Sequence, residues 1–107
     1  MKKDNQTIVN KIQNSFSGGG FMYNLRKYSY DDYSAVEFLN LIESINTNSI
    51  SNSEKFSYIL SIWQIPFLVS CWRLGLPHNI SDSMSFNKFF LDLNKLVEVK
   101  VNELCEQ

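Results

Sequence analysis

Residues 85–105, SFNKFFLDLNKLVEVKVNELC, carry the clearest structural signal in the chain. Apolar residues recur in this stretch at intervals of three and four, which places them along one face of an α-helix. The residues of this face are Phe86, Phe89, Phe90, Leu93, Leu96, Val97, Val101 and Leu104. We therefore predict a helix of about 20 residues that is buried along this face and capped by Asp82, Ser83 or Ser85.

Closer to the N-terminus, the same spacing predicts two more helices. One covers about residues 4–16, and the glycines at 18–20 end it because glycine accepts the left-handed conformation of a helix C-terminus. The other covers about residues 30–46, with Ser29 as its N-cap. Its expected buried residues are Ala35, Phe38, Leu39, Ile42 and Ile45. Residues 21–28, between the two helices, are predicted to form an extended connection or a frayed helix.

The segment that follows residue 50 is predicted to be helical as well. Ser51 and Glu54 have the spacing of a capping box, so a helix should begin near Asn52. Its expected buried residues are Phe56, Ile59, Leu60 and Trp63. Pro66 either kinks this helix or begins a separate helix that ends near Leu74.

Residues 58–76, YILSIWQIPFLVSCWRLGL, have the length of a membrane-spanning helix. Gln64, Pro66 and Arg73 lie within this stretch, and an arginine inside a bilayer is costly. We therefore interpret the stretch as a core helix that its neighbours bury on most sides, and we expect no membrane association. Residues 1–107 are then predicted to form one all-α domain, a compact bundle of four to five helices.

The chain offers few residues for catalysis or metal binding. His78 is its single histidine and lies in a predicted turn, and Cys71 and Cys105 are expected to be free, buried thiols. The His and Cys residues lack metal-ligand spacing, and the glycines at 18–20 lack the pattern of a phosphate-binding loop. We predict no catalytic residues, no cofactor and no metal, and hence no enzyme. The N-terminus lacks the apolar segment of a signal peptide, which favours the cytoplasm.

Charge is distributed unevenly along the chain, although the net charge is only −1. Residues 1–30 carry five basic residues and one acidic residue, residues 31–54 carry five acidic residues and no basic one, and residues 55–107 carry five of each. A protein that binds DNA or RNA usually presents clustered positive charge, because the phosphate backbone is negative. We therefore expect no direct contact with nucleic acid.

The acidic block of residues 31–54 begins beside tyrosines, a combination that suits a protein interface. Aromatic rings supply contact area, and carboxylates attract a basic partner. The residues predicted to make this contact are Tyr30, Asp31, Asp32, Tyr33, Glu37 and Glu43. The alternative interpretation is a solvated helix face whose charge the lysines near the N-terminus balance.

In its length, its acidic block, and its abundance of Asn, Ser and Ile with a single Ala, the chain resembles bacterial toxin-immunity proteins. It is similar in layout to the immunity proteins of contact-dependent growth inhibition systems, which neutralise nuclease toxins. The resemblance implies an antitoxin that binds a cognate basic toxin tightly and covers its active site. Acidic side chains would then pair with the lysines and arginines of the toxin. No motif carries the likeness, so no residue role is transferred.

A second hypothesis is a structural or assembly subunit that packs helix against helix. Residues 58–76 and 86–104 are rich in apolar side chains, and one small core can leave part of such a surface uncovered. A regulator of the helix-turn-helix type is the least favoured hypothesis, because its recognition helix would need clustered Arg and Lys. The sequence does not decide whether the chain dimerises.

Overall fold

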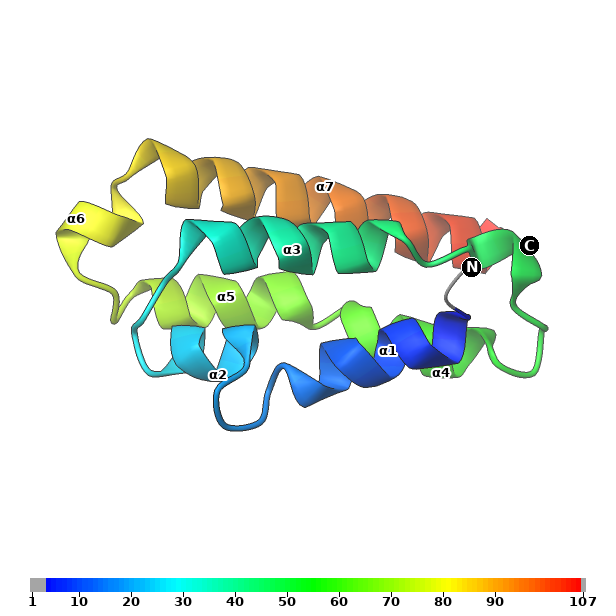
Figure 1. The fold of residues 1–107 in the computed structure, drawn as a ribbon. Helices are drawn as coiled ribbons and strands as arrows, with labels where there is room; N and C mark the ends of the chain where they lie inside the picture. The colour runs from blue at the N-terminus through cyan, green and yellow to red at the C-terminus, as the bar shows by residue number, and fades with distance from the viewer. Residues whose placement is uncertain (1–3, 107) are drawn as a thin grey trace.

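The helix predicted from residues 85–105 is the longest element among residues 4–106 and runs along most of the length of the molecule (Figure 1). The computed structural model describes residues 4–106, which extend over 42 × 25 × 22 Å along the principal axes. Its elements are α1 (Asn5–Asn14), α2 (Phe21–Arg26), α3 (Asp32–Glu43), the 3₁₀-helix η1 (Thr47–Ser49), α4 (Lys55–Ile62), α5 (Ile65–Arg73), α6 (His78–Ser81) and α7 (Met84–Glu106).

The all-α prediction is confirmed, since residues 4–106 form helices and no strand. These residues divide into more segments than the four to five expected, because residues 21–26 and 78–81 are helical and α4 ends before Pro66. Pro66 lies at the start of α5, where its missing N–H costs no hydrogen bond. Of the two alternatives for Pro66, the separate helix is therefore the correct one.

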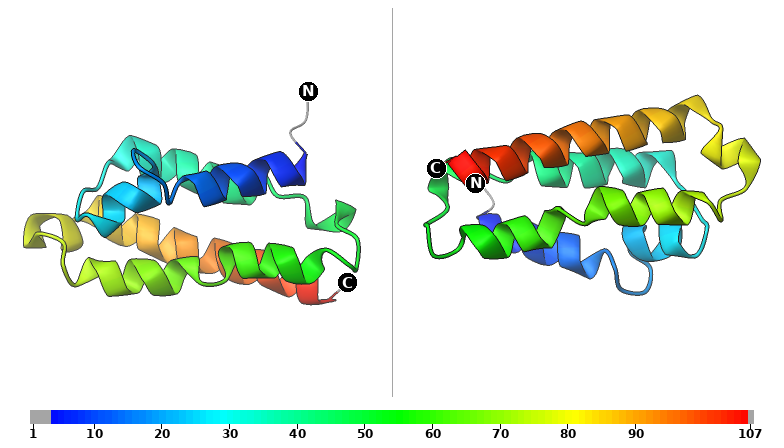
Figure 2. Two further views of the ribbon diagram at one scale, coloured as in Figure 1. Left: turned by 90° about the horizontal axis from the view of Figure 1, so that it is seen from below. Right: turned by 180° about the vertical axis from the view of Figure 1, so that it is seen from behind.

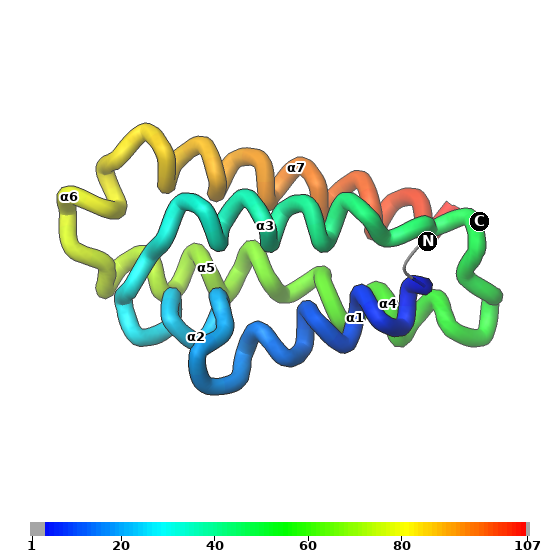
Figure 3. Tube along the Cα trace, viewed as in Figure 1, coloured from blue at the N-terminus to red at the C-terminus, as the bar shows by residue number. Residues whose placement is uncertain are grey.

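The helices enclose one apolar core beneath α7. α3 contacts α7 on one flank, and α4 and α5 contact it on the other. α1 contacts α3 and α4, and α2 contacts α3 and α5, so this pair closes the side away from α7 (Figure 2). Figure 3 follows the chain through this arrangement, and the start of α1 and the end of α7 lie at the same end of the molecule.

α7 forms because its cap and its apolar spacing agree. Ser83, one of the three predicted caps, accepts a hydrogen bond through Oγ from the backbone N–H of Phe86 at 3.1 Å. The fully buried residues of the predicted face are Phe86, Phe89, Leu93, Val97 and Leu104. The remaining three, Phe90, Leu96 and Val101, are half-buried against the core. The predicted face of α7 is therefore confirmed.

α1 and α2 differ in how well the sequence predicts them. Asp4 caps α1 by accepting from the N–H of Thr7 at 2.7 Å. Of the apolar residues expected on the buried side, Ile8, Val9 and Ile12 are buried, whereas Phe16 lies beyond the end of α1 and is exposed. Residues 21–26 form a regular helix, so the extended connection is wrong. Met22 and Leu25 are both fully buried, and their spacing of three residues fits a helix facing the core. Gly20 precedes α2, and a Cβ there would overlap the backbone of Ser15.

α3 begins and ends at different residues from those predicted. Its N-cap is Asp31 rather than Ser29, and Asp31 accepts a hydrogen bond from the N–H of Ser34 at 2.9 Å. Beyond its C-terminus, the carbonyl of Ile45 accepts from Lys100 Nζ of α7 at 2.8 Å. The helix is therefore held at both ends by side chain–backbone hydrogen bonds.

The predicted capping box before α4 is wrong. α4 begins at Lys55 with no side-chain cap, and the hydroxyl of Ser51 lies 3.1 Å from that of Ser53 instead. The backbone N–H of Glu54 donates to the Ser51 carbonyl, which makes a turn where the sequence predicts the first helical residues. The helix therefore starts three residues later than Asn52.

The predicted buried face of α4 is also wrong. Phe56, Leu60 and Trp63 are 69%, 45% and 52% exposed, and Ile59 alone of the predicted four is half-buried against the core. The structure instead buries Tyr58, Ile62, Ile65 and Val69 of α4 and α5. The exposed Phe56, Leu60 and Trp63, together with Phe67, are spaced four, three and four residues apart, and the four buried residues have the same spacing. The apolar pattern therefore fits either face.

Three further predictions concern single residues. Cys71 and Cys105 are free, as expected, but both are exposed rather than buried. Each lies on a side of its helix that no other helix covers, because Ile65 and Val69 of α5 occupy the core in place of Cys71. His78 is exposed, as expected of a turn, and it starts the single turn of α6.

Within residues 4–106, no helix combines the length and apolarity that crossing a membrane requires.

Candidate functional site on the outer face of α3

The predicted contact residues lie at the start of α3 and along its outer side. We define the α3 face as the exposed residues of this helix that carry its charge and its largest side chains: Asp32, Tyr33, Val36, Glu37 and Glu43. The opposite side of α3 is buried through Ala35, Phe38 and Ile42. Because the apolar residues fix which side of the helix faces the core, the acidic side must face solvent.

Asp31 is not a free contact residue. Its carboxylate accepts hydrogen bonds from the backbone N–H of Ser34 at 2.9 Å and from the Ser34 hydroxyl at 2.6 Å. These two bonds favour the charged form and lower the pKa of Asp31 below its ordinary value. The sequence placed Asp31 inside the predicted contact set, whereas the structure gives it the role of the helix cap.

Tyr30 is not a free contact residue either. Its ring is half-buried and packs edge-on against Phe86, with the ring centroids 5.2 Å apart, and against Phe21 at 6.4 Å. Its hydroxyl lies 3.4 Å from the backbone carbonyl of Ser85. Burial, and then the negative charge of Asp32, raise the pKa of Tyr30. The ring therefore anchors the start of α3 to α7 rather than facing a partner.

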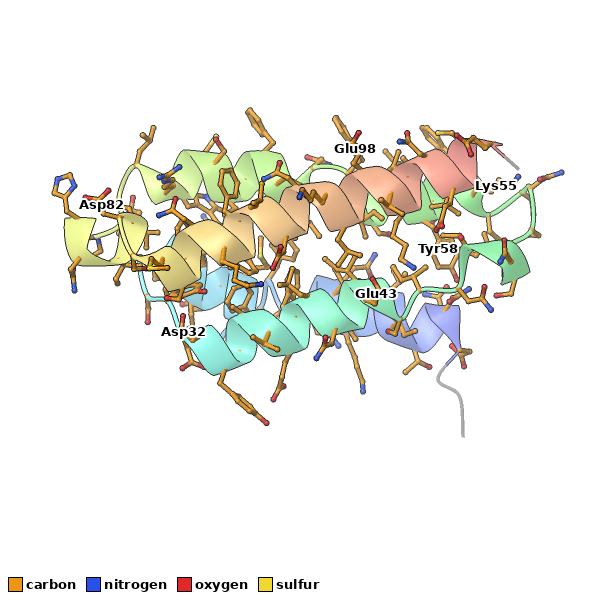
Figure 4. All side chains as sticks on the ribbon, turned by 90° about the horizontal axis from the view of Figure 1, so that it is seen from above. Asp32, Glu43, Lys55, Tyr58, Asp82 and Glu98 are labelled. Carbon is orange, nitrogen blue, oxygen red and sulfur yellow. The ribbon has the colours of Figure 1, made fainter. Side chains whose placement is uncertain are left out.

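The other four predicted residues do lie together on the surface. Tyr33 is 73% exposed, and a hydrogen bond with Glu37 one turn later raises its pKa. Asp32 and Glu43 lie at the two ends of α3 on the side nearest α7 (Figure 4). The structure thus exposes Asp32, Tyr33, Glu37 and Glu43 on one helix, makes the exposed Asp31 its N-cap, and leaves Tyr30 half-buried.

Within residues 4–106, the carboxylates of the α3 face form no ion pair with a lysine or arginine. Among residues 4–106 the ion pair found is Lys88–Asp92, which lies within α7, and none involves a carboxylate of α3. Val36 is 56% exposed between these carboxylates and adds an apolar contact that the sequence analysis did not single out. An exposed surface of this kind attracts cations from solution and stays available to a partner.

A groove between α1 and α3 borders the α3 face. It has a volume of about 1380 Å³, and Glu37 forms part of its lining together with Asp4 and Glu54. Lys11 of α1 lines it as well. The sequence analysis did not connect Asp4 with Glu54, because 50 residues separate them and only the packing of α1 beside α3 and α4 brings both to one groove.

The α3 face and the groove beside it differ from a metal centre and from a typical small-molecule pocket. Within the described part of the chain, no three His, Cys, Asp or Glu residues lie close enough to hold a metal ion. The groove is larger than the roughly 300–1,000 Å³ of a typical small-molecule pocket, so it suits a protein loop.

The chain matches no known family model, no characterised protein and no solved structure.

Proposed function

We propose that this protein is an immunity protein, an antitoxin that binds a cognate bacterial toxin with a basic nuclease domain and covers its active site. The observation that carries the proposal is the α3 face. Asp32, Glu37 and Glu43 lie exposed on one helix and form no ion pair within residues 4–106, and Tyr33 and Val36 lie between them.

The spacing of these carboxylates fits a surface that binds a phosphate backbone. Asp32 and Glu43 are 11 residues apart on a helix, a rise of about 16 Å. A strand of duplex DNA carries about five phosphates over that length. A nuclease binds those phosphates through lysines and arginines, so the same cations can pair with the α3 face. Binding there would both exclude the nucleic acid and neutralise the site that attracts it.

The neighbouring groove offers room for part of the toxin. Its acidic lining by Asp4, Glu37 and Glu54 favours a loop that carries lysine or arginine. Tyr33, which is hydrogen-bonded to Glu37 of the groove lining, supplies the type of side chain that contributes most to protein interfaces. The proposed contact surface is therefore the α3 face together with the α1–α3 groove.

The experiment begins with recovery of the toxin. The tagged protein is purified from its native cells, a co-purifying basic domain is identified by mass spectrometry, and that domain is expressed alone. Inhibition of its nuclease activity is then titrated with the wild-type protein. The proposal expects complete inhibition at one equivalent, and a recovered domain whose activity is unaffected would refute it.

The site is tested with two charge-matched variants. The first neutralises the α3 face through Asp32→Asn, Glu37→Gln and Glu43→Gln, and it spares Asp31 because that residue caps the helix. The control neutralises three exposed acids elsewhere through Asp82→Asn, Glu98→Gln and Glu106→Gln. The α3 variant should raise the dissociation constant at least about tenfold, whereas the control should change it less than about threefold. Equal effects of the two variants would remove the site from α3.

A second candidate function, an assembly subunit that packs helix against helix, is favoured by a different observation. The outer side of α4 and α5 exposes several large apolar residues, which a protein that acts only through α3 does not require. Recovery of the chain without a toxin, and with an intracellular assembly instead, would favour this candidate.

A further inference from the structure

A line of large exposed apolar residues follows the outer side of α4 and α5. Phe56, Leu60, Trp63 and Phe67 are 69%, 45%, 52% and 68% exposed, and we call these four residues the outer stripe. Their spacing of four, three and four residues aligns them along the two consecutive helices. Leu74, which is 90% exposed, continues the line at the end of α5.

A shallow groove runs beside the outer stripe. It lies between α5 and α7, has a volume of about 560 Å³, and is lined by Trp63 and Phe67 on one side and by Phe90 and Val101 on the other. The stripe and the groove therefore provide a protruding and a receding apolar surface next to each other. A surface that contains both can fit against a copy of itself.

The outer stripe is free of charge. Residues 56–72, FSYILSIWQIPFLVSCW, contain no acidic or basic side chain. The groove beside the stripe adds a single carboxylate, that of Glu98, so a charged partner would find less complementary charge here than on the α3 face. In a symmetric dimer each residue near the two-fold axis meets its own copy, so an uncharged stripe pairs with itself without repulsion of like charges.

The area of the stripe matches the apolar centre of a dimer interface. Three aromatic residues and one leucine, each about half to two-thirds exposed, present roughly 500 Å². A stable interface of standard size buries about 800 Å² on each partner, and its fully buried centre is about 65% apolar. The stripe therefore supplies the apolar part of one side, and the polar residues around it supply the rim.

We propose that the outer stripe is the interface of a symmetric homodimer, with the two-fold axis near Trp63. Trp63 lies in the middle of the stripe, so it faces the partner copy in any symmetric pairing of these helices. α3 lies on the other flank of α7, so dimerisation leaves both α3 faces open (Figure 4). The dimer goes beyond the proposed antitoxin function and does not depend on it.

Sedimentation equilibrium of the purified wild-type chain tests the proposal without any toxin. From about 1 µM to about 200 µM protein, the expected mass rises from the 12.5 kDa of one chain to twice that value. A wild-type mass that stays at one chain over this range overturns the proposal. If the mass stays at one chain and the protein also binds phosphatidylcholine vesicles, the stripe is assigned to a membrane surface instead.

Two stripe variants and one control locate the interface. Trp63→Glu and Phe67→Glu should each raise the dimer dissociation constant at least about tenfold, because each places a charge in the apolar centre. The control is Val99→Glu, since Val99 is 50% exposed on α7 and does not line the groove. All three residues are exposed, so the folded monomer should survive, and circular dichroism checks this. A dimer that persists in both stripe variants, or that Val99→Glu disrupts equally, overturns the proposal.

Discussion

The outer side of α3 and the outer side of α4 and α5 lie on opposite flanks of α7, and they differ in every property that decides binding (Figure 4). The α3 face carries three carboxylates around Tyr33 and Val36, whereas the outer stripe carries no charge over residues 56–72. α3 is also held at both ends by side chain–backbone hydrogen bonds, whereas α4 and α5 have no side-chain N-cap.

The difference indicates that the two flanks have different partners. A charged face on a firmly capped helix suits a charged partner that arrives from solution, because the carboxylates attract it and the helix keeps them in place. An uncharged stripe on uncapped helices gains stability when another surface covers it.

The largest effect should separate the inner and outer sides of α4. Ile62 is fully buried, so Ile62→Ala should lower the free energy of unfolding by about 3 kcal/mol, because it leaves a cavity. Leu60, two residues earlier and 45% exposed, is the matched control, and Leu60→Ala should cost less than about 1 kcal/mol. Urea unfolding at about 1 µM protein, where the monomer should prevail, measures both. Similar losses in the two variants would mean that the two sides are equally buried.

Salt should act on the two flanks in opposite ways. Raising sodium chloride from about 50 mM to about 500 mM should weaken toxin binding through the α3 face about tenfold, because salt screens exposed charges. The dimer should hold or tighten over the same range, since its interface is apolar. Biolayer interferometry measures the first and sedimentation equilibrium the second. Toxin binding that does not change with salt concentration would show that the toxin does not bind through the α3 face.

A smaller effect should follow from loss of the hydrogen bond at the end of α3. Lys100→Met removes the donor to the carbonyl of Ile45 and should lower the free energy of unfolding by about 1 kcal/mol. Lys95→Met, an exposed lysine earlier on α7, is the control and should have almost no effect. Urea unfolding of both variants decides the matter, and equal stabilities would show that the bond to Ile45 adds nothing.

The smallest effect should appear in acid, at the start of α3. The folded pKa of Asp31 lies below its unfolded value, so its cap stabilises the protein above the unfolded pKa of about 4 and is lost as the pH falls through the folded value. Asp31→Asn keeps an acceptor but does not titrate, so its stability should fall less between pH 5 and pH 2. Urea unfolding across that range measures the difference, and identical pH profiles would contradict the role of the charge.

The sequence predicted the helices best where polar and apolar residues alternate clearly. In α7 and α3, most residues of the outer side are charged or amide residues, so the longer apolar stripe marks the buried face, and both faces were predicted correctly. In α4 and α5, Phe56 and Tyr58 begin two apolar stripes of identical spacing. Local periodicity cannot choose between such stripes, because the choice depends on the neighbours that pack against them.

The same reasoning explains which site residues were predicted. Asp32, Glu37 and Glu43 had to be exposed, since a carboxylate is costly to bury without a partner. Tyrosine is found both in cores and on surfaces, so its sequence position left Tyr30 and Tyr33 undistinguished. Phe21 and Phe86, which surround Tyr30, come from α2 and α7, and only the tertiary fold brings them together.

The two stripes of α4 and α5 also bear on how the chain finds its fold. A folding chain could dock these helices with either side inward, which is a form of frustration. The inner stripe, Tyr58, Ile62, Ile65 and Val69, contains one aromatic ring, whereas the outer stripe contains three, those of Phe56, Trp63 and Phe67. A core shaped for the first set would be overpacked by the second. The volume of the side chains therefore favours the native orientation over the reversed one.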